Sequence, residues 1–268
     1  MTRTKFFIPL VTVTLLTVIM GLILISQELG SKVQGEETAP PTTEETQAPE
    51  DIIPAAIFKS DIAEYEEYMD VTDSKYLILV NKTNPIDESY TPEALVPVTD
   101  AKKAIELSET AEKALEAMFT EMRAQGFKNI FVTSAYRSYS YQYGLFFNTY
   151  LPQEMATGLS YDEAKQKVLT YSAYPGTSEH HTGLCVDLIS SSMRELDESF
   201  ANEAVYPWLL ENAWKFGFIL RYPEDKTDIT GYSFEPWHYR FVGRYHAYKI
   251  HSQNLCLEEY LLTLSTAD

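Results

Sequence analysis

The sequence is poor in cysteine and in basic residues. Its 268 residues include only two cysteines, Cys185 and Cys256, which excludes a small secreted scaffold stapled by several disulfides. One bridge between them and two separate buried thiols both fit that count. Lys and Arg number 21 against 39 Asp and Glu, giving a formal net charge of −18. Such an acidic chain repels a phosphate backbone, so we expect no nucleic-acid partner.

Long hydrophobic runs are also scarce, and there is no internal repeat. The one long run, residues 6–25, carries no charge and as a helix would span roughly 30 Å, about a bilayer core. Arg3 and Lys5 precede it and Glu28 is the first charge after it, which favours a cytoplasmic N-terminus. A cleaved signal peptide is the alternative, but its apolar core is usually roughly 7–15 residues long and ends in a small-residue site. We expect an uncleaved signal anchor over residues 1–27, with the rest of the chain extracytoplasmic.

A polar, acidic segment follows the hydrophobic run. Residues 34–51 are rich in Glu, Thr and Pro and contain six acids and no base. Such a composition cannot bury enough apolar surface to offset its ordering entropy, so we expect a disordered spacer over residues 28–60. Every Tyr and all three Trp lie beyond it, the first being Tyr65. Residues 61–268 are therefore expected to form one packed domain.

Apolar periodicity predicts the secondary structure of this domain. Helices are expected at residues 104–125, 139–150, 161–172 and 204–216. Strands are expected at residues 76–82, 129–136, 184–188, 218–222 and 237–243. Helices and strands do not alternate regularly. The pattern predicts an α+β fold, a small antiparallel sheet flanked by helices.

The stretch "SEHHTGLCVDL", residues 178–188, places His180 and Asp187 on either side of a turn at Gly183. Imidazole nitrogen and carboxylate oxygen are both zinc ligands, so the pair is a candidate metal site. A buried aspartate that accepts backbone N–H groups is an equally simple structural explanation. This stretch alone does not decide between them.

A second stretch, "FEPWHYRF", places Glu235 three residues before His238. Catalytic zinc takes three protein ligands and leaves one position open, and a nearby carboxylate that is not a ligand serves as the base. His180, Asp187 and His238 supply three ligands, and Glu235 supplies the acid. Pro236 disfavours a helix here, so a loop or strand edge is expected. The structural alternative is a surface Glu235 and a packed His238.

A third stretch, "SAYRSYSYQ", places Arg137 at the end of a predicted strand, five residues before Gln142. An arginine in that position can stabilise the oxyanion of a tetrahedral intermediate or hold a substrate carboxylate. Gln142 can hydrogen-bond a peptide group. The alternative is a surface arginine stacked on tyrosines.

Together these stretches resemble the VanY-type zinc D-alanyl-D-alanine carboxypeptidases, which trim the stem peptides of the bacterial cell wall. The resemblance rests on "SAYRS" with Gln142, "PGTSEHHTGLCVDL" and "GFILRYPEDKTDITGYSFEPWHYRFVG", and covers roughly residues 75–245. It implies a peptidoglycan substrate and one zinc ion at the sheet. The implied ligands are His180, Asp187 and His238.

The resemblance also implies roles for residues around the metal. Glu235 would take a proton from the zinc-bound water, and Arg137 would stabilise the transition state. Gln142 and Ser178 would contact the substrate. An L,D-carboxypeptidase acting on tetrapeptide stems would use the same metal site, and the motifs do not separate the two. A non-catalytic wall-binding module and a purely structural zinc site are further alternatives, although a structural site usually closes with four protein ligands.

His181 and Cys185 lie close in sequence to the proposed ligands, so each could also contact the metal. His181 adjoins His180, but its side chain is expected to point the other way, behind the ligands or into solvent. Cys185 lies two residues before Asp187 and so on the same face of a strand. It is expected to be a small packed residue, with a stray ligand as the alternative. His246 and His251 are expected to be ordinary residues of the C-terminal segment.

Overall fold

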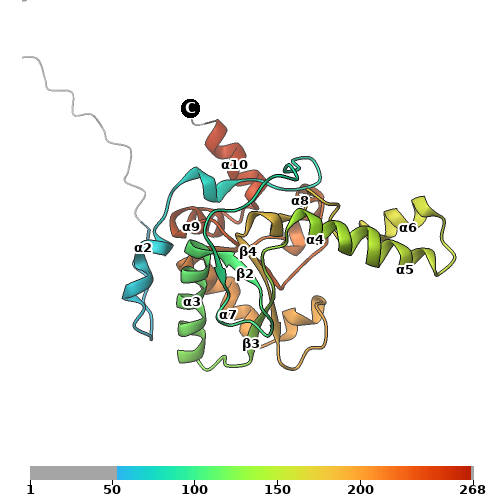
Figure 1. The fold of residues 1–268 in the computed structure, drawn as a ribbon. Coiled ribbons are helices and arrows are strands. Elements are labelled where there is room, and N and C mark those ends of the chain that lie inside the picture. The colour runs from blue at the N-terminus through green and yellow to red at the C-terminus, as the bar shows by residue number, and fades with distance from the viewer. Residues whose placement is uncertain (1–52, 267–268) are drawn as a thin grey trace, which may run out of the picture. The chain divides into compact units, whose positions relative to one another are not determined.

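The computed structural model describes residues 53–266 and confirms an α+β fold (Figure 1). Four antiparallel strands form the main sheet in the order β3-β4-β6-β5. They are β3 (Ile130–Ser134), β4 (Cys185–Ser190), β5 (Phe218–Leu220) and β6 (His238–Phe241). A separate antiparallel pair joins β1 (Leu95–Pro97) to β2 (Glu106–Ser108).

Helices and single turns surround the strands. In chain order they are η1 (Ala63–Tyr65), α2 (Glu66–Met69), η2 (Ser74–Leu77), α3 (Glu109–Ala124), α4 (Tyr139–Tyr143), the π-helical η3 (Gly144–Tyr150), α5 (Leu151–Met155), α6 (Tyr161–Val168), η4 (Glu179–Thr182), η5 (Glu198–Asn202), α7 (Val205–Asn212), η6 (Ala213–Phe216), η7 (Glu224–Lys226), α8 (Thr227–Thr230), α9 (Arg244–Ser252) and α10 (Leu257–Ser265). Within residues 53–266, none of these helices has the length and apolar character to cross a membrane. The predicted membrane helix at 6–25, and most of the predicted spacer, lie outside the described residues.

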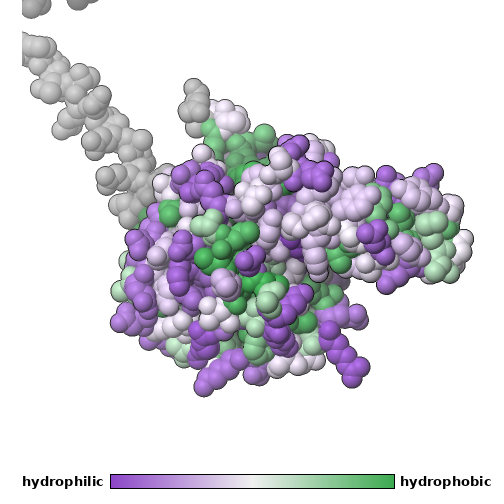
Figure 2. Space-filling model, viewed as in Figure 1, coloured by the Kyte–Doolittle hydropathy of each residue, from purple (hydrophilic) through white to green (hydrophobic). Residues whose placement is uncertain are grey.

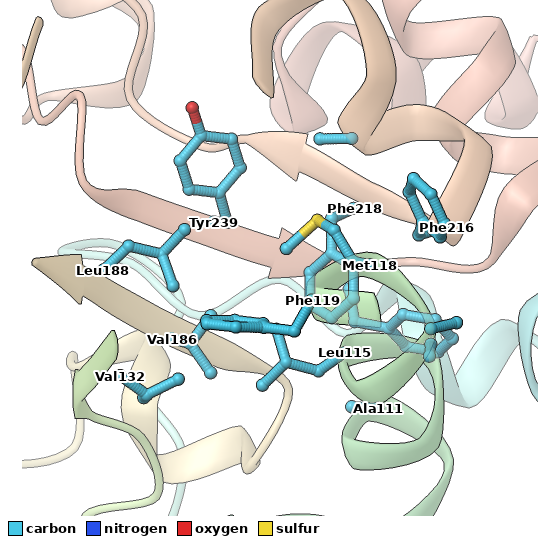
Figure 3. Packing of buried hydrophobic residues seen from close by; sticks show 14 of the residues in the cluster. Ala111, Leu115, Met118, Phe119, Val132, Val186, Leu188, Phe216, Phe218 and Tyr239 are labelled. Carbon is cyan, nitrogen blue, oxygen red and sulfur yellow. The ribbon is translucent and has the colours of Figure 1, made fainter. Parts of the chain in front are cut away.

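The two faces of the sheet differ in chemistry. Val186 and Leu188 of β4 and Tyr239 of β6 belong to the same buried apolar cluster as Leu115 and Phe119 of α3 (Figure 3). Side chains alternate along a strand, so the neighbours of these residues point the other way. The register pairs Asp187 with His238 and Cys185 with Arg240. The face opposite the core therefore carries the predicted metal ligands.

The first predicted helix is confirmed as α3, but it begins at Glu109 rather than near residue 104. Residues 106–108 pair with β1 instead and form β2. Apolar side chains repeat along one side of the helix and are buried, among them Leu115, Met118 and Phe119. Gly126 follows with φ +103, as expected of a residue that ends a helix.

The predicted strand at residues 76–82 is wrong. Residues 74–77 form the 3-10 turn η2, although Tyr76 and Leu77 are buried as a strand would require. The physical reason is Arg240, whose Nη2 donates to the carbonyls of Tyr76 and Ile78 at 2.9 Å each. A guanidinium thus occupies the acceptors that a neighbouring strand would use. A hydrogen-bonded turn follows at Asn81–Asn84.

The remaining predicted elements are confirmed with small shifts of boundary. Helix 139–150 is the run α4–η3–α5, which continues to residue 155, and helix 161–172 ends earlier, as α6 at residue 168. Ser160 and Glu163 form a capping box at the start of α6. These helices project from the body of the domain (Figure 1) and bury a small apolar cluster of their own.

Contacts with the domain begin before the predicted boundary at residue 61. The backbone N–H groups of Lys59 and Ser60 donate to the Glu121 carboxylate at 2.8–3.0 Å. The rings of Phe58 and Phe216 lie 5.2 Å apart. Residues 58–60 are thus tied to α3 and the core.

Polar side chains cover much of the face viewed in Figure 2, broken by apolar areas.

Candidate active site

The three predicted metal ligands converge at the centre of the sheet. Asp187 comes from β4 and His238 from β6, while His180 comes from η4, which ends at Gly183 with φ +65 and turns the chain back into β4. His180 Nε2 lies 3.1 Å from Asp187 Oδ2, and His238 Nδ1 lies 2.9 Å from Asp187 Oδ1. All three side chains are buried.

Hydrogen bonds behind the two histidines fix which ring nitrogen faces the aspartate. His180 Nδ1 lies 2.7 Å from the carbonyl of Ala135, which can only accept, so Nδ1 carries the proton. His238 Nε2 lies 3.1 Å from the Glu179 carboxylate in the same way. In a neutral ring the other nitrogen then points a lone pair at a carboxylate oxygen. Such an arrangement calls for a cation between the groups, and two imidazoles and a carboxylate are a donor set that suits zinc.

Charge around Asp187 favours its ionised form. Burial alone would raise its pKa. When protons rather than a metal ion lie between the rings and Asp187, the charge of His180 and hydrogen bonds from His180 and His238 outweigh burial and hold that pKa well below its usual range. An ionised carboxylate is the form that binds a metal.

Glu235 lies beside this cluster without joining it. It precedes a turn in which the His238 N–H donates to the Glu235 carbonyl at 3.2 Å, and Pro236 lies in that turn, as the sequence predicts. The carboxylate Oε2 is 3.7 Å from His238 Nδ1, the nitrogen that faces Asp187. Burial raises the pKa of Glu235 to about 7, although His238 opposes the shift. A carboxylate in that position can exchange protons with a molecule held next to the ligands.

Arg137 leans over the same cluster from the end of β3. Its guanidinium donates to Ser134 Oγ at 3.0 Å and to Gln142 Oε1 at 3.1 Å. A third contact joins Nη2 to Asp187 Oδ2 at 3.2 Å. Its side chain is 21% exposed, so the arginine is held in place yet still faces the cavity.

Gln142 is fully buried, and both ends of its amide are engaged by the protein. Oε1 accepts from Arg137, and Nε2 donates to the carbonyl of Ala173 at 2.7 Å. In this structure it positions Arg137, and its direct contact with substrate stays a prediction. Ser178, the other predicted substrate contact, lines the cavity.

A cavity of about 860 Å³ opens over these residues. Arg137, Ser178, Asp187, Glu235 and His238 lie on its wall. Aromatic side chains also lie on the wall, namely Tyr150, Tyr171, Tyr222, Tyr232, Phe234 and Trp237. Acidic side chains, Glu195, Asp197 and Glu198, line it as well. The cleft thus combines aromatic surface with many polar groups, as a site for a polar small substrate would.

A buried ionic network behind the site escaped sequence analysis. Glu179 Oε1 accepts from Arg221 Nε at 2.8 Å and from Arg240 Nη1 at 2.7 Å, while its other oxygen faces His238. Arg221 also forms a two-pronged pair with Glu258 of α10, at 2.7 and 2.8 Å. The sequence feature that could have indicated this network is an arginine inside each of two apolar strand segments, Arg221 in "FILRY" and Arg240 in "HYRF".

His181 and Cys185, the two residues close in sequence to the predicted ligands, differ in their surroundings. His181 is buried, not exposed, and both its nitrogens are engaged: Nδ1 donates to the Arg137 carbonyl at 2.6 Å, and Nε2 accepts from Gly176 N–H at 3.1 Å. Cys185 is not simply a packed residue, because donor atoms of His180, Cys185 and His238 all lie within 4.8 Å of one another. Cys185 and Cys256 are both free and buried, so two separate thiols is the arrangement observed.

Comparison with known proteins agrees with this geometry. Residues 104–244 match the family model described as "VanY: D-alanyl-D-alanine carboxypeptidase". A D-alanyl-D-alanine carboxypeptidase of Enterococcus faecalis is 44% identical over 187 residues, which is 70% of this chain. The match spans 66% of that relative, just under two thirds of its length.

Solved structures of similar proteins include two with different activities. A mutant of the vancomycin-resistance D,D-pentapeptidase VanY, in complex with Zn(II), is 40% identical, with a TM-score of 0.59, covering 70% of this chain and 99% of that one. The L,D-carboxypeptidase LdcB is 37% identical, with a TM-score of 0.61, covering 69% of this chain and 85% of that one. The motifs, the fold and the match over more than half of the sequence agree, and the chain belongs to the VanY family of D-alanyl-D-alanine carboxypeptidases.

Proposed function

We propose that this protein is a zinc-dependent D,D-carboxypeptidase that removes the terminal D-alanine from peptidoglycan stem peptides. The observation that carries the proposal is the convergence of His180, Asp187 and His238, with Glu235 beside them. The zinc-bound relative and the cavity over these residues support it.

Each residue of the site has a distinct task in this reaction. His180, Asp187 and His238 hold the ion, which when bound lowers the pKa of a water molecule and polarises the scissile carbonyl. Glu235 takes a proton from the attacking water and returns it to the departing amine of D-alanine. Arg137, fixed by Ser134 and Gln142, donates to the oxyanion that develops on the carbonyl oxygen.

The second candidate is an L,D-carboxypeptidase that takes D-alanine from a tetrapeptide stem. The observation in its favour is the similarity to LdcB, whose TM-score of 0.61 is close to the 0.59 of the VanY structure. The two activities share ligands and base and differ in the bond that the cleft presents to them. Product analysis on both stems separates the two candidates.

We also propose that residues 6–25 anchor the protein in the bacterial membrane and that residues 28–60 tether the catalytic domain outside it. This proposal rests on sequence alone. A flexible tether of about 30 residues reaches roughly 30 Å, which lets the domain search the wall near its anchor. Carbonate extraction of membranes should leave the full-length protein in the pellet, and release into the supernatant would contradict the anchor.

The test of function uses the full-length protein with penta- and tetrapeptide stems and mass spectrometry of the products. We expect the pentapeptide to lose one alanine, a chelator to stop the reaction and added zinc to restore it. Glu235→Gln should slow release by about 10²–10⁴-fold, while Glu224→Gln, which changes an exposed acid outside the cavity, should not slow it. Release that survives both the chelator and Glu235→Gln would sink the mechanism. Stem binding with no product would instead favour the wall-binding module.

A further inference from the structure

The described residues place a thiol at the metal site, where the reaction proposed above has no task for it. Cys185 precedes Asp187 by two positions on β4, so both side chains project from the same face of the sheet. That face carries His238 and Arg240 across the strand pair, whereas Val186 on the opposite face packs into the apolar core. Cys185 thus borders the metal ligands and not the core.

The donor atoms of His180, Cys185 and His238 lie near enough to share an ion after a small movement. They lie within 4.8 Å of one another. In a tetrahedral zinc site, a nitrogen bound at about 2.1 Å and a sulfur bound at about 2.3 Å lie about 3.6 Å apart. The Cys185 sulfur and the two ring nitrogens therefore need to approach one another by at most about 1.2 Å when the ion binds. The Cys185 side chain is fully buried, so no solvent has to be displaced from the sulfur.

We propose that Cys185 is a fourth protein ligand of this metal centre, binding as a thiolate through Sγ beside His180, Asp187 and His238. The inference rests on the metal site of the proposed function. Thiolate is a soft ligand and shifts a site's preference toward thiophilic ions such as Zn²⁺ and Cd²⁺. On binding, the thiol proton leaves to solvent and the metal–sulfur bond takes its place.

A fourth protein ligand has a consequence for the resting state. Catalytic zinc sites keep a position open for water, whereas four protein ligands close a tetrahedral site. Coordination by Cys185 therefore makes the resting centre more tightly held and less open than a three-ligand site. The attacking water then enters as a fifth ligand or in place of the thiolate.

Cobalt replacement tests the assignment directly. Full-length protein is stripped with a chelator and loaded with Co²⁺, as wild type and as Cys185→Ala, Cys185→Ser and Cys256→Ser. A thiolate ligand gives a strong near-ultraviolet charge-transfer band that nitrogen and oxygen ligands do not give. We expect the band in wild type and Cys256→Ser and its loss in both Cys185 variants, which still show the visible bands of bound cobalt. Cys256 caps α10 outside the site, and serine keeps a side-chain oxygen for that cap.

Metal affinity gives a second readout that does not depend on turnover. Cd²⁺ affinity in the Cys185 variants should fall by more than the roughly 10–100-fold typical of residues that only support ligands. Circular dichroism of the metal-free variants shows whether they fold, and serine is the milder change if alanine fails. Bound cobalt without the charge-transfer band in wild type would overturn the role of Cys185 alone. Failure of every form to bind cobalt would overturn the metal site itself, and with it the proposed function.

Discussion

The two faces of the β4–β6 pair put alternating residues of the same short strands to opposite uses. Toward α3, Val186, Leu188 and Tyr239 are buried among apolar side chains (Figure 3). On the other face, Asp187 and His238 are equally buried but surrounded by charge. The first face stabilises the domain by removing apolar surface from water. The second buries charges, and the cost of removing them from water must be offset by their partners.

The prediction with the largest expected effect concerns a variant that alters only the side of the sheet where the predicted metal ligands lie. Glu235→Gln keeps the shape of the side chain and removes the base, so we expect turnover to fall by about 10²–10⁴-fold. The melting temperature should move little, because Glu235 is partly exposed and outside the core. Steady-state kinetics and calorimetry measure both quantities. A large loss of stability with little loss of turnover would show that Glu235 stabilises the domain and does not serve the reaction.

The second test removes one partner from the buried network. Arg240→Met leaves Glu179 with one arginine and leaves the carbonyls of Tyr76 and Ile78 without their donor. Breaking one side of a buried pair typically costs about 3–5 kcal/mol. We expect denaturant unfolding to show a loss of that order. Arg194→Met, which removes an exposed arginine, is the matched control. A fully stable Arg240→Met protein would show that the network is replaceable by apolar packing.

The third test removes apolar volume from the other face, next to a ligand in sequence. Leu188→Ala should cost about 2–5 kcal/mol of unfolding free energy, through lost burial and the cavity left behind. Asp187 points the opposite way, so turnover of the folded fraction should stay near wild type. Kinetics well below the melting temperature check this. A loss of turnover as large as in Glu235→Gln would mean that the faces are not separable.

The smallest expected effect concerns pH and a glutamate on α3. Glu112 Oε1 accepts from Thr99 N–H at 2.8 Å, but among the described residues no donor reaches Oε2. Burial raises its pKa from 4.5 to about 7. Between those values the native state keeps a proton that the unfolded state has lost, so the unfolding free energy falls as pH rises from 4.5 to 7.

Glu112→Gln removes that titration. The variant should match wild type near pH 4.5 and become the more stable protein above pH 7, as followed by urea unfolding across this range. Glu109→Gln, on the exposed side of the same helix, should not change the pH dependence. A wild-type-minus-variant difference that is flat with pH would show that Glu112 is ionised in the native state.

Sequence analysis predicted the elements that depend on patterns between residues close together in the chain. The helical repeat of α3 and the strands around Asp187 and His238 are local signals, and the resemblance of the motifs to a known family indicated which residues act together as ligands. The strand at residues 76–82 failed because its carbonyls are taken by Arg240, more than 160 residues away. The Glu179 network was missed for the same reason. Its partners are distant in sequence, and no periodic pattern links them.

The partnership of Arg221 with Glu258 connects the last helix to the reacting centre. Glu258 in α10 holds Arg221, Arg221 holds Glu179, and Glu179 orients the His238 ring. Loss of Glu258 is thus communicated inward through two salt bridges and one hydrogen bond. Proteolytic trimming of α10 would leave the catalytic side chains in place yet leave Arg221 short of a counter-charge. Fusions and shortened forms of the protein should accordingly keep α10 intact, because its Glu258 supports the residues behind the site.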